Sequence, residues 1–164
     1  MRLLFALFFF AFNLCAQEGV WYKSLETALE HPSQVYQLQL KRKGFTNFPK
    51  ELSQFPNLVK LDLSKNKIQS FPDSLSYLSK LTFLDLSRNG ISKIPKHISQ
   101  LESIVHLDLW DNYINVLPLE IGQLVNLKYL DIRGVAIFYQ KYNLYLEMMK
   151  SVDFFMSEPC DCQE

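Results

Sequence analysis

The sequence contains few cysteines and glycines, and it lacks the motifs that most enzymes need. Only 3 of its 164 residues are cysteine and 5 are glycine, and no glycine-rich phosphate loop, H-E-x-x-H or C-x-x-C motif occurs. The C-x-C pair Cys160 and Cys162 is too small for a structural zinc site, which needs four ligands. The formal net charge of 0 is not that of a dedicated nucleic-acid-binding protein. We therefore expect no bound metal, no cofactor and no nucleic-acid partner.

Long apolar runs are also absent, apart from one at the N-terminus. Arg2 is followed by an unbroken apolar run over residues 3–12, which is too short to cross a hydrocarbon core of about 30 Å as a helix. The pattern is that of a secretory signal peptide over residues 1–16, cleaved near Ala16 to give an exported protein, secreted or held in the envelope. Cys15 leaves lipidation as an alternative, which Leu14 disfavours because a small residue normally precedes a lipidated cysteine. A retained anchor is the other alternative.

Apolar positions recur with a period of 23 residues from Val35 onward. Five consecutive copies cover 35–57, 58–80, 81–103, 104–126 and, partially, 127–149, with no residue gained or lost between them. The middle three follow L-x-x-L-x-L-x-x-N-x-I-x-x-h-P-x-x-h-x-x-L-x-x, in which h is apolar, with Ile104 in place of the first leucine of the fourth copy. The L-x-L at positions 4 to 6 has the period of a short strand, and the proline begins a 3₁₀ or helical turn on the return. Such repeats stack into a solenoid.

Position 9 of the repeat holds a polar residue on an inward-facing site. It is Asn66, Asn89 and Asn112 in the three middle copies. A buried amide is tolerated when it bonds to backbone groups of neighbouring coils, so we expect these asparagines to form a ladder. Lys43 and Val135 replace asparagine in the first and last copies, which confines the ladder to the interior of the array.

Segments that do not repeat flank the array at both ends. Residues 17–34 are expected to form an N-terminal helical cap, in which Ser24 caps a short amphipathic helix that Pro32 ends. At the other end, aromatic and apolar residues follow at helical spacing up to Val152. This spacing predicts a C-terminal helical cap over 138–164 that overlaps the last repeat. The caps would cover the apolar ends that a solenoid otherwise exposes.

The repeat resembles the leucine-rich repeat superfamily in its 23-residue class, over residues 35–149. The lead-in over residues 25–38 and the closing segment Leu130-Asp131-Ile132-Arg133-Gly134 resemble those of short exported bacterial proteins of that family. The resemblance implies an α/β fold, a leucine-rich repeat solenoid in which strands and helical or 3₁₀ turns form a short right-handed superhelix. It also implies a parallel sheet on the concave face, a role in binding and no catalytic residues.

Positions 3, 5 and 7 of each copy are expected to point outward from the concave face. The last three strands place aromatic side chains there, and such residues dominate the energetics of interfaces. Position 5 adds a column of aspartates, and position 7 ends with an arginine. The predicted partner-binding residues are Phe83, His106, Trp110, Tyr129, Asp85, Asp108, Asp131 and Arg133.

The sequence thus predicts a monomeric, non-enzymatic module that recognises a protein or peptide through its concave face. A catalytic triad of Ser87, His106 and Asp108 is disfavoured, because Ser87 at position 7 and His106 at position 3 lie about 13 Å apart along the strand direction. A structural or self-associating envelope protein is the alternative, and a cation bound by the aspartate column is a third hypothesis. A basic stripe at positions 7 to 10 of the first three copies suits an anionic partner or peripheral contact with a membrane.

Overall fold

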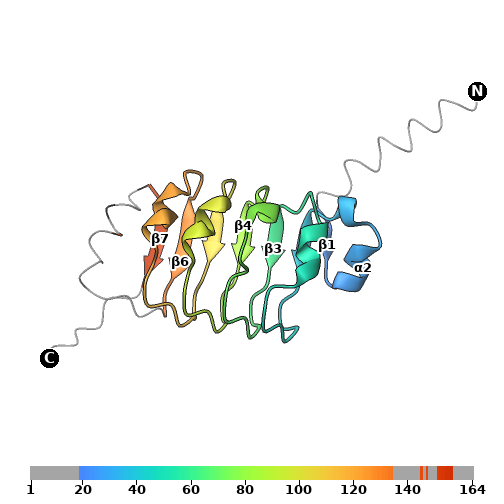
Figure 1. Cartoon of the computed structure of the whole chain (residues 1–164), viewed down its shortest axis with the longest axis horizontal. Coiled ribbons are helices and arrows are strands. Elements are labelled where there is room, and N and C mark those ends of the chain that lie inside the picture. The colour runs from blue at the N-terminus through green and yellow to red at the C-terminus, as the bar shows by residue number, and fades with distance from the viewer. Residues whose placement is uncertain (1–18, 135–144, 146, 148–150, 157–164) are drawn as a thin grey trace, which may run out of the picture.

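One sheet of parallel strands runs along the whole array, with its strands in sequence order (Figure 1). The computed structural model describes residues 19–134, 145, 147 and 151–156. Within them the strands are β1 (Trp21–Tyr22), β2 (Gln37–Gln39), β3 (Lys60–Asp62), β4 (Phe83–Asp85), β5 (His106–Asp108), β6 (Tyr129–Ile132) and β7 (Asp153–Met156). The repeats thus form the parallel sheet of the expected solenoid, and the sheet extends by a strand at each end.

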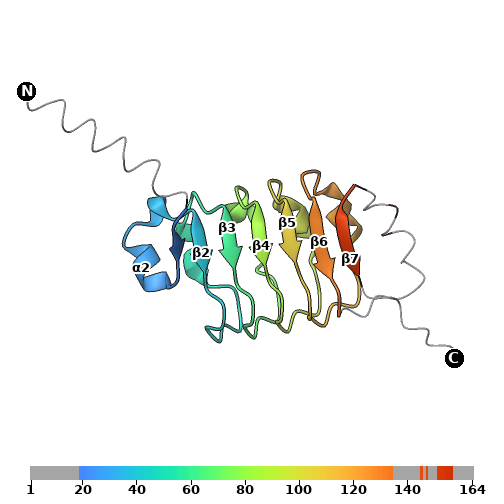
Figure 2. The same ribbon diagram turned by 180° about the vertical axis from the view of Figure 1, so that it is seen from behind.

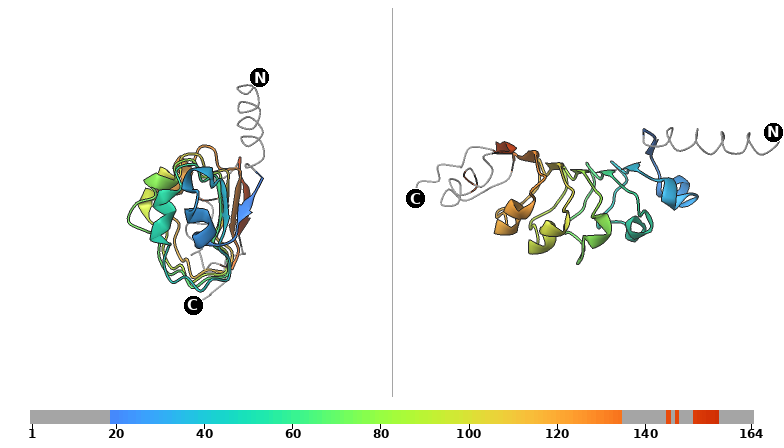
Figure 3. Two further views of the ribbon diagram at one scale, coloured as in Figure 1. Left: turned by 90° about the vertical axis from the view of Figure 1, so that its right-hand side faces the viewer. Right: turned by 90° about the horizontal axis from the view of Figure 1, so that it is seen from above.

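The return half of each coil lies on the side of the molecule opposite to the sheet (Figure 3). It contains short 3₁₀ turns: η2 (Lys50–Gln54), η3 (Ser76–Leu78), η4 (Lys96–Gln100) and η5 (Leu119–Gln123). Three of these turns begin directly after the repeat proline, at Pro49, Pro95 and Pro118. The fixed backbone angle of proline favours this start, and the prediction of a proline-initiated 3₁₀ turn is confirmed there.

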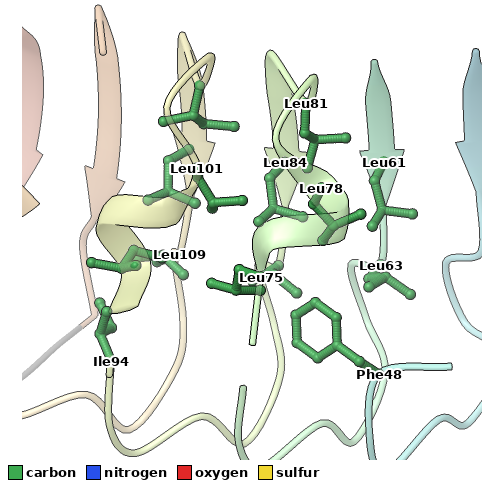
Figure 4. Packing of buried hydrophobic residues seen from close by; sticks show 14 of the residues in the cluster. Phe48, Leu61, Leu63, Leu75, Leu78, Leu81, Leu84, Ile94, Leu101 and Leu109 are labelled. Carbon is green, nitrogen blue, oxygen red and sulfur yellow. The ribbon is translucent and has the colours of Figure 1, made fainter. Parts of the chain in front are cut away.

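The register of the sheet advances by one whole repeat from strand to strand. Leu38 pairs with Leu61, Leu61 with Leu84, and Leu84 with Leu107. Each repeat position therefore stacks on its own copies, and the leucines of the strands, with those of the 3₁₀ turns, fill one continuous core (Figure 4). This stacking turns every position of the 23-residue repeat into a column across the sheet.

The asparagine ladder is confirmed, and each of its members ties two coils together. The side-chain amide of Asn89 donates to the carbonyls of Leu63 at 3.1 Å and Leu86 at 2.9 Å, and its oxygen accepts the N–H of Ile68 at 3.0 Å. Asn66 and Asn112 make the corresponding contacts one coil on either side. Buried backbone groups that lack a partner within the turn are satisfied in this way.

Position 8, which precedes the asparagine in the three middle copies, has a left-handed backbone conformation in all five copies. The φ angles are 57° at Arg42, 58° at Lys65, 55° at Arg88, 57° at Asp111 and 75° at Gly134. A residue with a Cβ pays about 1 kcal/mol for this conformation, and only the last copy avoids that cost with glycine. The turn at position 8 directs the chain out of the strand and the asparagine into the core.

The N-terminal cap contains the predicted helix together with a strand. Ser24 caps α2 (Leu25–Leu29) by accepting the N–H of Thr27 at 3.2 Å, and a 3₁₀ turn, η1 (Pro32–Gln34), follows. Before the helix, β1 adds to the sheet beside β2, which the sequence did not predict. The signal peptide predicted over residues 1–16 lies outside the described residues.

The C-terminal cap departs from a purely helical one. Most of the helix predicted over residues 138–152 lies outside the described residues, but Tyr145 and Glu147 are helical. Tyr145 is fully buried, and its hydroxyl donates to the carbonyl of Leu117 at 2.7 Å. Residues 153–156 form β7, an extended strand inside the predicted helical cap. Cys160 and Cys162 also lie outside the described residues, and no helix within the described ranges is long and apolar enough to cross a membrane.

Candidate partner-binding face

The open face of the sheet is the face turned away from the leucine core and the 3₁₀ turns. Figure 2 views the strands from this side, and no described helix or turn lies in front of β3 to β6. Every partner-binding residue predicted from the sequence lies on β4, β5 and β6 or directly after them. The structure therefore places all eight at the same side of the sheet, although Asp131 is buried there.

An aromatic row crosses the open face, consisting of Phe83, His106, Tyr129 and Phe155. The rings of Phe83 and His106 stack with centroids 4.5 Å apart, and those of His106 and Tyr129 stack at 4.0 Å with an interplanar angle of 3°. Phe155 on β7 continues the row, 5.2 Å from Tyr129 and tilted by 40°. Stacked neighbours hold each ring in place, so the row is a rigid aromatic strip.

Phe155 is the member of this row that the sequence did not predict. Phe155 lies on β7, after the predicted helix. In the pairing of β6 with β7, Tyr129 lies opposite Asp153, and this spacing differs from the 23 residues that separate paired residues within the repeats. Phe155 lies beside Asp131 at position 5, and it is 41% exposed. Only the pairing of β7 with β6 reveals that the closing segment contributes to the face.

The aspartate column runs beside the aromatic row at position 5 and comprises Asp62, Asp85, Asp108 and Asp131. One carboxylate oxygen of each accepts the backbone N–H two residues on, at 2.9 to 3.0 Å. The serine hydroxyls at position 7 also donate to Asp62 and Asp85. These bonds fix the carboxylates in one orientation on the sheet.

The two ends of the column have further side-chain partners, whereas its middle does not. Asp62 accepts from the amide of Gln39 at 3.0 Å, and Asp131 forms an ion pair with Arg133 at 2.6 Å. Asp131 is only 1% exposed, so it positions Arg133 and has little surface for a partner. In the part of the chain that is described, no basic side chain pairs with Asp85 or Asp108.

The pKa values of Asp85, Asp108 and Asp131 differ according to their surroundings. Burial raises the pKa of Asp108 from 3.8 to about 6, against a backbone hydrogen bond from Trp110 that lowers it. Burial also raises the pKa of Asp85, and it lowers the pKa of His106 in the neighbouring aromatic row. Burial opposes ionisation of Asp131 too, but the hydrogen bonds and charge of Arg133 outweigh it, and the pKa of Asp131 falls below its ordinary value.

Trp110 and Arg133 border the column on its other side, at position 7. The guanidinium of Arg88 lies 4.5 Å from the centroid of the Trp110 ring and also pairs with Asp111 at 3.7 Å. Arg133 lies 5.6 Å from the ring centroid of Phe155. Aromatic surfaces on this face therefore already accommodate cations from the chain itself.

We expect the Asp108→Asn variant to be more stable than the native chain at pH 7.5, by about 1 kcal/mol once solvent screening is included. Asparagine can still accept from the Trp110 N–H, and it removes a carboxylate whose ionised form is disfavoured by burial. Because the folded pKa is raised, the favourable contribution of Asp108 is complete below pH 3.8 and is lost as the pH rises through about 6.

Urea unfolding of both proteins at pH 7.5 and pH 4 measures this difference. The gain should disappear at pH 4, where Asp108 is protonated in the fold. The exposed Asp73, on the return half of its coil, provides the control: Asp73→Asn should change little at either pH. An equal effect of Asp108→Asn at both pH values would contradict the raised pKa of Asp108.

Comparison with known proteins agrees with this geometry. Residues 33–91 match the leucine-rich repeat family. A leucine-rich repeat protein of Leptospira interrogans is 30% identical, with a TM-score of 0.73 over 84% of this chain and 35% of that one. An internalin of Listeria monocytogenes shares the fold, at 20% identity and a TM-score of 0.53 over 75% of this chain and 35% of the other. No curated protein sequence matches the chain.

The chain is a leucine-rich repeat protein. It spans about a third of the length of the two bacterial proteins, 35% in each case. Repeats of this family typically serve as protein-binding modules and are generally not enzymes. Among the described residues, no group of three or more histidine, cysteine, aspartate or glutamate side chains is arranged to hold a metal ion.

Proposed function

We propose that this chain is an exported binding module that recognises a protein or peptide segment through the open face of its sheet. The observation that carries the proposal is the aromatic row, which presents stacked rings on a surface that no described helix or turn covers. Apolar area of this kind favours association because a partner removes it from water. The signal peptide expected over residues 1–16 supports an exported location.

Rigidity of the face supports the same function. Stacking fixes the rings of His106 and Tyr129, and hydrogen bonds fix the carboxylates beside them. A pre-organised surface loses little conformational entropy on binding, which leaves more of the contact energy as affinity. The short array, with strands about 4.8 Å apart, matches one loop or an extended segment of a partner better than a large protein surface.

Removing three of the four rings of the aromatic row should lower the affinity about 100-fold or more, because central aromatic residues commonly contribute 2 kcal/mol or more each. Peptides would be selected by display from a random library on the native chain. Their affinity would then be measured for the triple variant Phe83→Ala, His106→Ala, Tyr129→Ala. Tyr113→Ala is the matched control, because Tyr113 is 77% exposed and lies outside the aromatic row.

Unfolding curves establish that the triple variant retains its fold. Unchanged affinity in a folded triple variant would move the binding site away from the open face. Self-association is the competing function, and sedimentation of the native chain over a range of concentrations would detect it. Dimers that form without a peptide and disappear in the triple variant would favour that alternative.

A further inference from the structure

We propose that the segment bound on the open face presents a lysine or arginine whose cation lies between Asp85 and Asp108. This inference rests on the proposed function and adds the chemistry of the partner. It starts from Asp85 and Asp108, the two middle carboxylates of the aspartate column. Neither forms an ion pair among the described residues, and neither receives a side-chain donor on its second oxygen as Asp62 does from Gln39 and Asp131 does from Arg133.

Each of these carboxylates has one oxygen in use and one available. The Oδ1 atom of Asp85 accepts from the N–H and the hydroxyl of Ser87, and the Oδ1 atom of Asp108 accepts from the N–H of Trp110. No described donor contacts the Oδ2 atom of either residue. The two residues are direct partners on β4 and β5, so their side chains lie side by side at about the 4.8 Å spacing of the strands.

The ends of the column indicate which kind of group completes it. At one end Asp131 receives the guanidinium of Arg133, and at the other Asp62 receives the amide of Gln39. Both are long side chains of this chain that donate hydrogen bonds to a carboxylate. A donor from a partner would make the same kind of contact at Asp85 and Asp108.

The surroundings of this position suit an organic cation. The rings of Phe83 and His106 lie along one side, and Trp110 lies on the other, where Arg88 already packs on an indole face. The methylene stem of a lysine or arginine would pack on these rings while its charged end meets the carboxylates. A calcium ion suits the position less well, because Ca²⁺ takes six to eight oxygen ligands. An acidic partner would meet repulsion along the column.

The experiment uses peptides selected by display from a random library on the full chain. A lysine or arginine should be enriched at one position, and replacing it by norleucine, which keeps the stem and removes the charge, should weaken binding about tenfold or more. The double variant Asp85→Asn, Asp108→Asn should bind the lysine peptide about tenfold less tightly and should hardly distinguish it from the norleucine peptide. Asp73→Asn is the control, because this exposed aspartate lies on the return half of its coil.

The outcomes separate this inference from the function on which it rests. Two results would overturn the inference alone. The selected peptides could depend on the aromatic row but contain no enriched basic residue. Alternatively, exchange of the lysine for norleucine could weaken binding equally to the native chain and to the double variant. Failure to select any peptide that depends on the aromatic row would overturn the proposed function and the inference together. Coupling of at least tenfold between the lysine and the two aspartates would support both.

Discussion

Replacing Asn89 by alanine is expected to lower the free energy of unfolding by about 4 kcal/mol. The substitution leaves the N–H of Ile68 and the carbonyls of Leu63 and Leu86 without the amide that now satisfies them. Each buried backbone group left unpaired costs about 1 to 3 kcal/mol, partly recovered where water can enter. Equilibrium unfolding in urea, followed by circular dichroism, measures the change.

A matched control for this prediction is Asn126→Ala. Asn126 also donates to a carbonyl of the preceding coil, that of Glu102 at 2.8 Å, but the bond is exposed. Water replaces the lost donor, so the expected change is below about 0.5 kcal/mol. A cost of Asn89→Ala close to that of Asn126→Ala would contradict the role of the ladder.

The second large effect is expected at the C-terminal end of the array. Tyr145→Ala should cost about 4 kcal/mol, because it removes a fully buried aromatic ring and leaves a cavity against the last complete coil. Tyr145→Phe should cost only about 1 to 2 kcal/mol, the value of the hydrogen bond to the Leu117 carbonyl. Tyr113→Ala, at a tyrosine that is 77% exposed, is the control and should change little.

The part of the array that loses stability in Tyr145→Ala tests this prediction further. Each coil of a solenoid contacts only its neighbours, so damage at one end spreads inward only gradually. Hydrogen exchange should therefore accelerate in the copy over residues 104–126 much more than in the copy over residues 58–80. A uniform acceleration along the array would show that Tyr145 does not act as an end cap.

The sequence predicts the repeat, the strands and the asparagine ladder because each is encoded by residue type at a fixed spacing. Leucine at positions 4 and 6 is stable only in the apolar core, and asparagine at position 9 is stable there only when backbone groups bond to its amide. The left-handed turn at position 8 is not predictable in this way. Its residues include Lys65, Asp111 and Gly134, which share no chemistry, so the packing of the coil imposes the conformation.

The same distinction applies to the candidate site. The position of Asp108 and Asp131 on the open face follows from the period, but their environments do not. Asp131 forms an ion pair with Arg133, which lowers the pKa of Asp131, whereas burial raises the pKa of Asp108 to about 6. Phe155 escaped prediction because a four-residue strand outside the repeat has no periodic signal, and only pairing with β6 aligns it.

The column arrangement of the fold also sets the unit in which this chain can change length. A gain or loss of 23 residues, one whole copy, keeps leucine on leucine, asparagine on its carbonyls and ring on ring. A change of another size has to be accommodated in a loop of one coil, because a strand whose pairing shifts by one residue exchanges its inner and outer faces. Variation among related chains is therefore expected to proceed in whole copies, which lengthen the recognition face without redesigning it.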